Sequence, residues 1–262
     1  MTFTPAHRGG SGPPLVCLHG FADTWRVWEL VLPALERRHD VLAPTLPGHA
    51  GGPPIEGPIT GDTLADGVER TLDAAGIDTA HLVGNSLGGH VALQLAARGR
   101  ARSVVAFAPA GGWDGGGLPP ELLRRQRGLL AAAKAIAPHA AAITATPEGR
   151  RRATELIVGD PEGIPAELIA HLMLGVAACP RGADLLDRAG EIDWTLDAAR
   201  IDCPVRVVWG TADRLLPWPA AATRLRRDWL PQADWVELEG VGHCPQLDVP
   251  LEAAQLVLGV TG

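Results

Sequence analysis

The residues best suited to chemistry lie in a glycine-rich segment that reads Gly84-Asn85-Ser86-Leu87-Gly88-Gly89. An apolar run of strand length precedes it, and an apolar helical stripe (Val91, Ala92, Leu95) follows it. A serine on a sharp strand-to-helix turn takes strained backbone angles, and the residues two positions away must be small for the turn to close. The pattern therefore predicts an exposed Ser86 hydroxyl at the amino end of a helix, where the dipole favours developing negative charge. A glycine-rich turn with an incidental serine is the alternative.

A serine hydroxyl is a poor nucleophile until a base takes its proton. Among the nine histidines of the chain, His243 lies in a glycine-rich loop after the apolar run Trp235–Leu238. A loop at the carboxyl end of a strand can reach over the sheet toward the serine. Asp213 follows a second strand-like run, Val205–Gly210, and its carboxylate can accept from the other imidazole nitrogen. Asp114, in a glycine-rich stretch after the preceding strand, is the rival acid and is more typical of a turn residue.

These side chains need a scaffold, and the chain alternates apolar runs of strand length with helix-like segments. Runs of Val, Leu and Ala without polar alternation are typical of strands buried on both faces of a parallel sheet. The alternation predicts a doubly wound α/β fold with a mostly parallel sheet and right-handed crossovers. The expected strands before the middle of the chain are Leu15–His19, Val41–Pro44, His81–Gly84 and Ser103–Pro109.

The alternation breaks between about Gly111 and Ile192. This stretch opens with glycines and prolines and continues as an Ala-rich helix from Pro120 to Ala137, followed by further helical pieces. An insertion in an α/β sheet is expected at the carboxyl ends of the strands, over the ligand crevice. We therefore expect a core made of residues 1–111 and 192–262, with residues 112–191 as a helical insertion.

The chain resembles the α/β-hydrolase superfamily, specifically its capped, esterase-like members, in a set of motifs whose order and spacing match those of the family. The motifs are LHGF (Leu18–Phe21), LPGH (Leu46–His49), GNSLGG (Gly84–Gly89), GTADRLLP (Gly210–Pro217) and GVGHCPQLDVP (Gly240–Pro250). The resemblance covers nearly the whole chain. It implies an α/β-hydrolase fold with a helical cap inserted after the strand that follows the nucleophile helix. Because little chain precedes Leu15, the usual pair of leading strands does not fit at full length.

The resemblance also assigns roles to individual residues. Ser86 is expected to be the nucleophile, Asp213 the acid and His243 the base, in the chain order typical of this fold. The backbone N–H groups of Phe21 and Leu87 are the expected oxyanion donors. His19, in the LHGF motif, is expected to support the oxyanion loop rather than to act as a base.

Eight tryptophans and no tyrosine bear on the substrate site. Trp25 and Trp28, after the LHGF motif, and Trp113, at the start of the insertion, are candidates for lining an apolar pocket. The spacing of Trp25 and Trp28 equally suits the buried face of a helix. Epoxide hydrolases and haloalkane dehalogenases of this fold use an aspartate nucleophile, which Ser86 replaces, and epoxide hydrolases also need tyrosines. Carbon–carbon hydrolases usually carry a Gly-Pro-Gly oxyanion loop, which is absent from the HGFADTW segment.

The expected activity is hydrolysis of carboxylic esters with small to medium, mainly apolar substrates, through a Ser-His-Asp triad and an acyl-enzyme. Carbon–carbon, thioester or lactone hydrolysis on the same triad stays open, as does a non-catalytic small-molecule-binding member of the fold. No metal, flavin or nicotinamide motif is visible, so no cofactor is expected.

The composition bears on which other classes of protein the chain could belong to. The 262 residues are 46% hydrophobic with a net charge of −7, and this mild acidity argues against a dedicated nucleic-acid binder. No uninterrupted apolar run reaches about 18 residues, so no membrane span is expected. The start of the chain lacks the apolar stretch of a secretory signal, and four scattered cysteines suggest neither a zinc site nor disulfides. We expect a cytoplasmic protein that acts on a small-molecule ester; the oligomeric state stays open.

Overall fold

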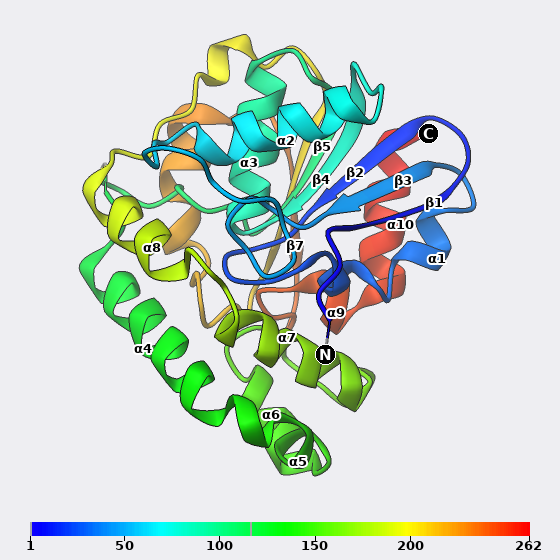
Figure 1. Cartoon of the computed structure of the whole chain (residues 1–262). Helices are drawn as coiled ribbons and strands as arrows, with labels where there is room; N and C mark the ends of the chain where they lie inside the picture. Colours follow the sequence, from blue (N-terminus) through cyan, green and yellow to red (C-terminus); the bar gives the residue numbers. More distant parts are fainter. Residues whose placement is uncertain (1, 116) are drawn as a thin grey trace.

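A seven-stranded, mostly parallel sheet forms the centre of the computed structural model, which describes residues 2–115 and 117–262 (Figure 1). The strand order is β1-β3-β2-β4-β5-β6-β7. Only the β1–β3 pair among these described strands is antiparallel. The predicted doubly wound α/β architecture is therefore confirmed. The strands are β1 Ala6–Gly10, β2 Pro14–Leu18, β3 Asp40–Pro44, β4 Ala80–Asn85, β5 Ala101–Phe107, β6 Val205–Gly210 and β7 Asp234–Leu238.

Helices cover both faces of the sheet (Figure 1). Alternate residues of β2 show the two layers, because Val16 and Leu18 pack in the same apolar cluster as α2 and α3, whereas Leu15 and Cys17 pack with α1 and α10. This alternation is the consequence of side chains pointing to opposite faces along a strand. The covering helices are α1 Leu32–Leu35, α2 Thr63–Ala74, α3 Leu87–Ala97, α9 Pro245–Asp248 and α10 Pro250–Thr261.

Residues 112–191, here called the helical segment, form a group of helices beside this core (Figure 1). They comprise α4 Pro120–Ile136, α5 Ala140–Thr144, α6 Pro147–Thr154, α7 Ala166–Ala177 and α8 Gly182–Glu191. Helix α4 begins at Pro120, as the sequence predicts. Among the described helices none is by itself both long and apolar enough to cross a bilayer, and α7 with α8 meets that criterion only as a pair bent by 67°.

Strand β1 was not predicted, because its sequence AHRGG lacks an apolar run. It pairs along its whole length with β3 at the sheet edge, and Arg8 forms an ion pair with Asp40 at 2.7 Å. In the described part of the chain β1 alone precedes β2, which agrees with the expectation that two full-length leading strands do not fit.

The turn from β4 to α3 brings two backbones into close contact. Ser86 lies at the turn with φ 56° and ψ −117°, in a region of positive φ that side chains other than glycine rarely adopt. A Cβ atom on Gly84 would lie 2.2 Å from the carbonyl oxygen of Gly88, and one on Gly88 would lie 2.2 Å from that of Leu18. Only glycine fits at these two positions, so their spacing around Ser86 follows from steric exclusion.

This contact predicts a large effect of Gly88→Ala. The added methyl group would collide with backbone rather than with a mobile side chain, so we expect the free energy of unfolding to fall by at least about 2 kcal/mol. Gly128→Ala is the matched control, because nothing lies within 4 Å of a Cβ atom there, and it should be neutral or slightly stabilising in α4. Urea denaturation measures both; equal stability of Gly88→Ala and the wild type would contradict the steric argument.

Candidate active site

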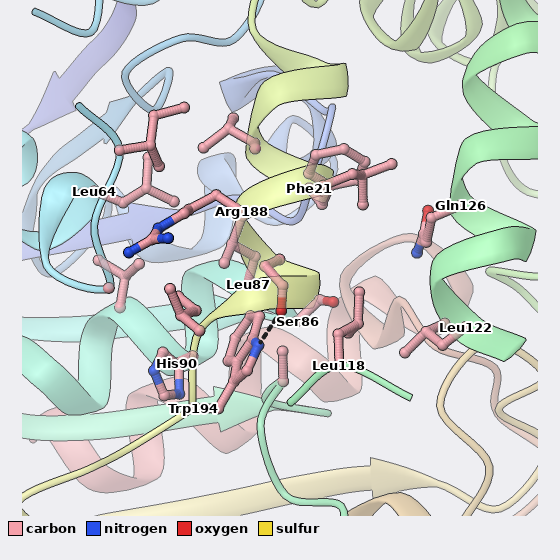
Figure 2. Close-up of a pocket in the computed structure, with 18 of the residues that line it drawn as sticks. Phe21, Leu64, Ser86, Leu87, His90, Leu118, Leu122, Gln126, Arg188 and Trp194 are labelled. Carbon is pink, nitrogen blue, oxygen red and sulfur yellow. Dashed lines mark hydrogen bonds between the residues drawn. The ribbon is translucent and has the colours of Figure 1, made fainter. Parts of the chain in front are cut away.

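Ser86 lines a cavity of about 140 Å³ between the core and the helical segment (Figure 2). The wall near Ser86 includes Leu87 from the start of α3 and Phe21 from the loop after β2. The opposite wall includes Leu122 of α4 and Leu186 of α8. The helical segment therefore lies over the carboxyl end of β4, where Ser86 follows the strand.

His243 and Asp213 form a buried pair. Imidazole Nδ1 lies 2.7 Å from Asp213 Oδ2, and the two side chains are 2% and 0% exposed. The other carboxylate oxygen accepts the backbone N–H groups of Leu215 at 2.8 Å and Leu216 at 2.7 Å, which fixes its orientation. Because Nδ1 donates to this carboxylate, the neutral imidazole has its lone pair on Nε2. That nitrogen is buried and has no hydrogen-bond partner among the described residues, as a base awaiting a proton requires.

Asn85, the residue before the serine, links the turn to the loop that carries His243. Its Nδ2 donates to the carbonyl of His243 at 2.9 Å and to that of Phe107 at 3.1 Å. Its Oδ1 accepts from the thiol of Cys244 at 3.3 Å and from Nε2 of Gln246 at 3.2 Å. One buried amide thus uses its full hydrogen-bonding capacity to hold the two loops together. The sequence analysis missed this role, although a polar side chain at the buried end of an apolar strand was a visible signal.

The two expected oxyanion donors lie beside the serine. Phe21 and Leu87 both line the cavity with Ser86, and neither backbone N–H donates to another residue in the described ranges. A Cβ atom on Gly20 would lie 3.4 Å from Cβ of Ser86, so the loop after β2 reaches the serine. The structure therefore brings Ser86 together with the two backbone groups that the sequence named.

His19 holds this loop in place as a neutral side chain. Its Nε2 accepts the N–H of Leu46 at 2.8 Å, so Nδ1 carries the proton and donates to the carbonyl of Gly20 at 2.7 Å. Burial, together with the neighbouring His49, lowers the pKa of His19 well below its usual value. His19 therefore links the loop after β2 to the loop after β3, as the sequence analysis expected of a supporting residue.

The rival acid lies elsewhere. Asp114 is 61% exposed and forms an ion pair with Arg227 at 3.2 Å. The carboxylate next to His243 belongs to Asp213. Glycine-rich surroundings place Asp114 in a surface turn, which was the other interpretation of this residue.

The tryptophans divide between the cavity and the core. Trp113 lines the cavity together with Trp194, which the sequence analysis did not single out, and their ring centroids are 5.2 Å apart. Trp25 and Trp28, the other two candidates for a pocket wall, do not line this cavity. They lie in a short 3-10 helix, η1 (Trp25–Trp28). This helix directs Trp28 into the core, where its ring centroid lies 6.0 Å from that of Phe107. Trp25 instead donates from its indole N–H to Thr4 at 2.8 Å.

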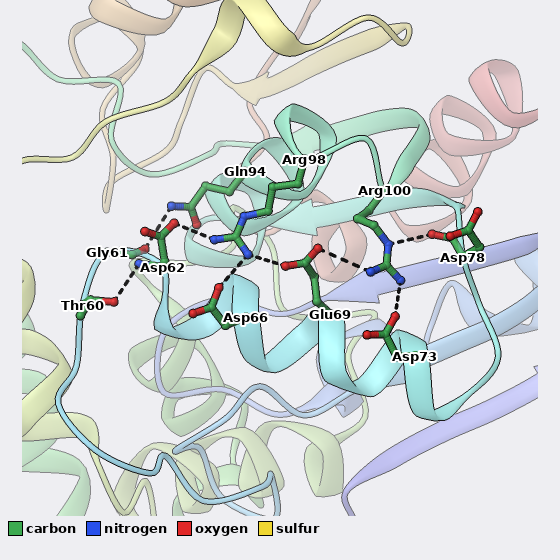
Figure 3. A network of polar contacts seen from close by, with 10 residues as sticks. All are labelled: Thr60, Gly61, Asp62, Asp66, Glu69, Asp73, Asp78, Gln94, Arg98 and Arg100. Carbon is green, nitrogen blue, oxygen red and sulfur yellow. Dashed lines mark hydrogen bonds and ion pairs between the residues drawn. The ribbon is translucent and has the colours of Figure 1, made fainter.

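A polar wall of the cavity is held by an ion-pair network (Figure 3). Arg98, directly after α3, binds Asp62 at 2.7 Å, Asp66 at 2.7 Å and Glu69 at 2.5 Å. Gln94, one turn earlier in α3, donates to the carbonyl of Gly61 at 3.0 Å. Asp62 and Gly61 both line the cavity. The network thus fixes this wall against α3 and engages the Asp62 carboxylate with an arginine.

Asn85→Ala should destabilise the protein by about 2–4 kcal/mol, because it leaves several buried polar groups without partners. Gln94→Ala is the matched control, since that side chain makes a single hydrogen bond at the edge of the same cavity, and a loss of no more than about 1 kcal/mol is expected. Urea denaturation of the two variants provides the comparison. Equal losses would mean that Asn85 does not link the loops.

The buried histidines predict a pH dependence of stability. Burial lowers the pKa of His49 and of His90 from 6.5 to about 4, so between these values the unfolded chain binds more protons than the folded protein. Their stabilising contribution is complete above pH 6.5 and is lost as the pH falls toward 4. Between pH 7 and pH 5 we expect a loss of about 2 kcal/mol for each imidazole.

Urea titrations at the two pH values measure this loss. His90→Gln should reduce it by about 2 kcal/mol, whereas substitution of the exposed His139 by glutamine serves as the control. If His90→Gln and the wild type lose the same stability, the buried neutral state of His90 is contradicted.

The chain is similar to known proteins along most of its length. Residues 15–256 match the alpha/beta hydrolase family. Epoxide hydrolase EphH of Mycobacterium tuberculosis is 36% identical over 199 residues, which cover 74% of this chain and 91% of that protein. Pimeloyl-[acyl-carrier protein] methyl ester esterase of Aromatoleum aromaticum is 30% identical over 258 residues, which cover 94% of this chain and 96% of that esterase.

A solved structure agrees with the sequence relatives. The crystal structure of a hydrolase from Pseudomonas aeruginosa PA01 superposes with a TM-score of 0.74 at 25% identity, over 98% of this chain and 93% of the other. The expected fold is thereby confirmed in its sheet and covering helices. The chain is a hydrolase and belongs to the alpha/beta hydrolase family.

Proposed function

We propose that the protein is a serine hydrolase that cleaves carboxylic esters. The observation that carries this proposal is the buried pair of His243 and Asp213, whose free imidazole nitrogen Nε2 has no partner among the described residues. Asn85 joins the loop of that histidine to the turn that presents Ser86. A nucleophile, an oriented base and a fixed carboxylate are the components that acyl transfer by a serine needs.

The reaction follows from these positions. Ser86 Oγ attacks the ester carbonyl carbon while His243 Nε2 takes the hydroxyl proton. The backbone N–H groups of Phe21 and Leu87 donate to the oxygen that becomes negatively charged, and Asp213 stabilises the imidazolium. His243 then protonates the leaving alcohol. Water activated by the same imidazole cleaves the acyl-enzyme and restores the free serine.

Substrate size and polarity follow from the cavity. Leucine is the commonest residue in its walls, which also carry the indole rings of Trp113 and Trp194. A volume of about 140 Å³ favours acids and alcohols of small to medium size. In this proposal the helical segment acts as a cap, because Leu122 and Leu186 close the side of the cavity that the core leaves open.

The epoxide hydrolase relative raises a second activity. An epoxide hydrolase of this fold forms its ester intermediate on an aspartate and activates the epoxide with tyrosines. This chain has a serine at the turn and no tyrosine, which favours ester hydrolysis. The relative named as a methyl ester esterase, matched over nearly its whole length, supports the same choice. Thioesters, lactones and carbon–carbon bonds remain alternative targets of the same triad.

Kinetics with short-chain 4-nitrophenyl esters test the proposal. Ser86→Ala and His243→Ala should each lower kcat by a factor of about 10³ or more, because either change removes the activated nucleophile. Binding of esters without turnover would overturn the proposal and favour a binding protein. Wild-type activity in Ser86→Ala would overturn the assignment of Ser86 as the nucleophile.

The two candidate acids form a matched pair. Asp213→Asn should lower kcat by a factor of 10² or more, since it removes the group that orients His243, by the reasoning that gives about 10⁴ in a serine protease triad. Asp114→Asn should leave kcat near the wild-type value. The reverse order of effects would place the acid on the other loop.

A further inference from the structure

Arg188 of α8 supplies the one arginine or lysine side chain among the described residues that line the cavity. The side chain is 41% exposed, but its Nε atom is buried and has no hydrogen-bond partner in the described part of the chain. In Figure 2 the guanidinium lies away from Ser86. A guanidinium N–H without a protein acceptor needs water or a ligand to accept from it, and a ligand carboxylate is the stronger acceptor.

The arrangement of its donors restricts what that acceptor can be. Glu191 accepts from Nη1 of Arg188 at 3.1 Å. The opposite edge of the guanidinium, formed by Nε and Nη2, donates to no described residue. Its two N–H bonds are parallel and match the two oxygens of a carboxylate. The unused edge therefore has the shape of a carboxylate-binding group.

Neighbouring acidic groups do not occupy this edge. Asp62, which lines the same cavity, is bound by Arg98 at 2.7 Å. Asp193 also lines the cavity but is exposed to solvent. Leu87 and Val91 line the same cavity, so a substrate that reaches from Ser86 to the guanidinium needs an apolar middle.

We propose that Arg188 binds a carboxylate of the substrate at the end of the cavity remote from Ser86. The preferred esters then carry a carboxylate that an apolar spacer separates from the scissile carbonyl, in either the acyl or the alcohol part. This inference rests on the proposed ester hydrolysis and specifies its substrate class. Arg188 acts as a specificity-determining residue and takes no part in bond cleavage.

Two matched substrate series test it. The acyl series compares 4-nitrophenyl hydrogen esters of succinic to suberic acid with 4-nitrophenyl esters of unbranched monocarboxylic acids of equal length. The alcohol series compares acetate esters of ω-hydroxy acids with those of the matching alkanols. In at least one series, and at one chain length of it, the wild-type kcat/KM for the ester that carries a carboxylate should exceed that for its neutral match by about tenfold or more. Arg188→Met should lower kcat/KM for that ester by about 10- to 100-fold and leave its neutral match within about threefold.

Controls separate charge, geometry and folding. Arg188→Lys keeps the charge without the paired N–H bonds, so it should restore only part of the preference. Arg124→Met is the matched control, because that arginine lies exposed on α4 and pairs with Glu121, and it should keep the wild-type preference. The proposal is overturned if no chain length favours the carboxylate, or if Arg188→Met slows both members of a pair equally.

A binding measurement distinguishes failure of this inference from failure of the proposed function. If no ester is turned over, neutral ones included, the proposed function fails. Monomethyl adipate is then titrated into Ser86→Ala protein while the fluorescence of the cavity indoles, Trp113 and Trp194, is followed. Saturable binding supports the carboxylate site if the Kd rises about tenfold in the double variant that carries both Ser86→Ala and Arg188→Met. Absence of saturation, or an equal Kd without the arginine, overturns it.

Discussion

The site depends on how closely the start of α3 approaches the end of β2. Because a Cβ atom on Gly88 would lie 2.2 Å from the carbonyl oxygen of Leu18, the helix begins directly against the sheet. Ser86 is left at the corner with positive φ, where its hydroxyl faces the cavity and the helix dipole acts on it. The same closeness brings Gly20 against the serine. One steric constraint therefore positions Ser86 and the two backbone N–H groups that we propose as oxyanion donors.

The loop that carries His243, the proposed base, is held from two sides. Asn85 binds the carbonyl of His243 from the sheet. Asp248 accepts the N–H of Gly242 in the same loop and also that of Gly159 in the helical segment, each at 2.7 Å. The helical segment and the loop that carries His243 therefore both donate a hydrogen bond to the Asp248 carboxylate. We expect a change in the position of one segment to affect the other, because both donate to the same half-buried carboxylate.

Some of this arrangement could be predicted from the sequence because burial and turns leave local patterns. The apolar run Val205–Gly210 coincides with β6, and the glycine spacing around Ser86 reflects a backbone contact. Strand β1 escaped prediction because pairing with β3 and an ion pair stabilise it, rather than an apolar run. The spacing of Trp25 and Trp28 suited a pocket wall and a core equally, and only the packing of η1 decides between them.

Residues that act through distant partners were harder to predict. Asn85 meets His243 across 158 positions of sequence, and no local pattern records that pairing. The unused guanidinium edge of Arg188 is visible only when the cavity and the position of Glu191 are known together. Ser86, Asp213 and His243 could be proposed as a triad from the sequence because strand ends gather at one edge of a parallel sheet. No comparable rule of topology predicts which side chains orient the loops or select the substrate.

The central claim is that His243 activates Ser86 for attack. The most direct measurement is reaction of the protein with diethyl 4-nitrophenyl phosphate, followed by intact-mass and peptide mass spectrometry. We predict one diethyl phosphoryl adduct, located on Ser86, which forms much more slowly in His243→Ala. An adduct on another residue, or equal rates with and without the imidazole, would contradict the claim.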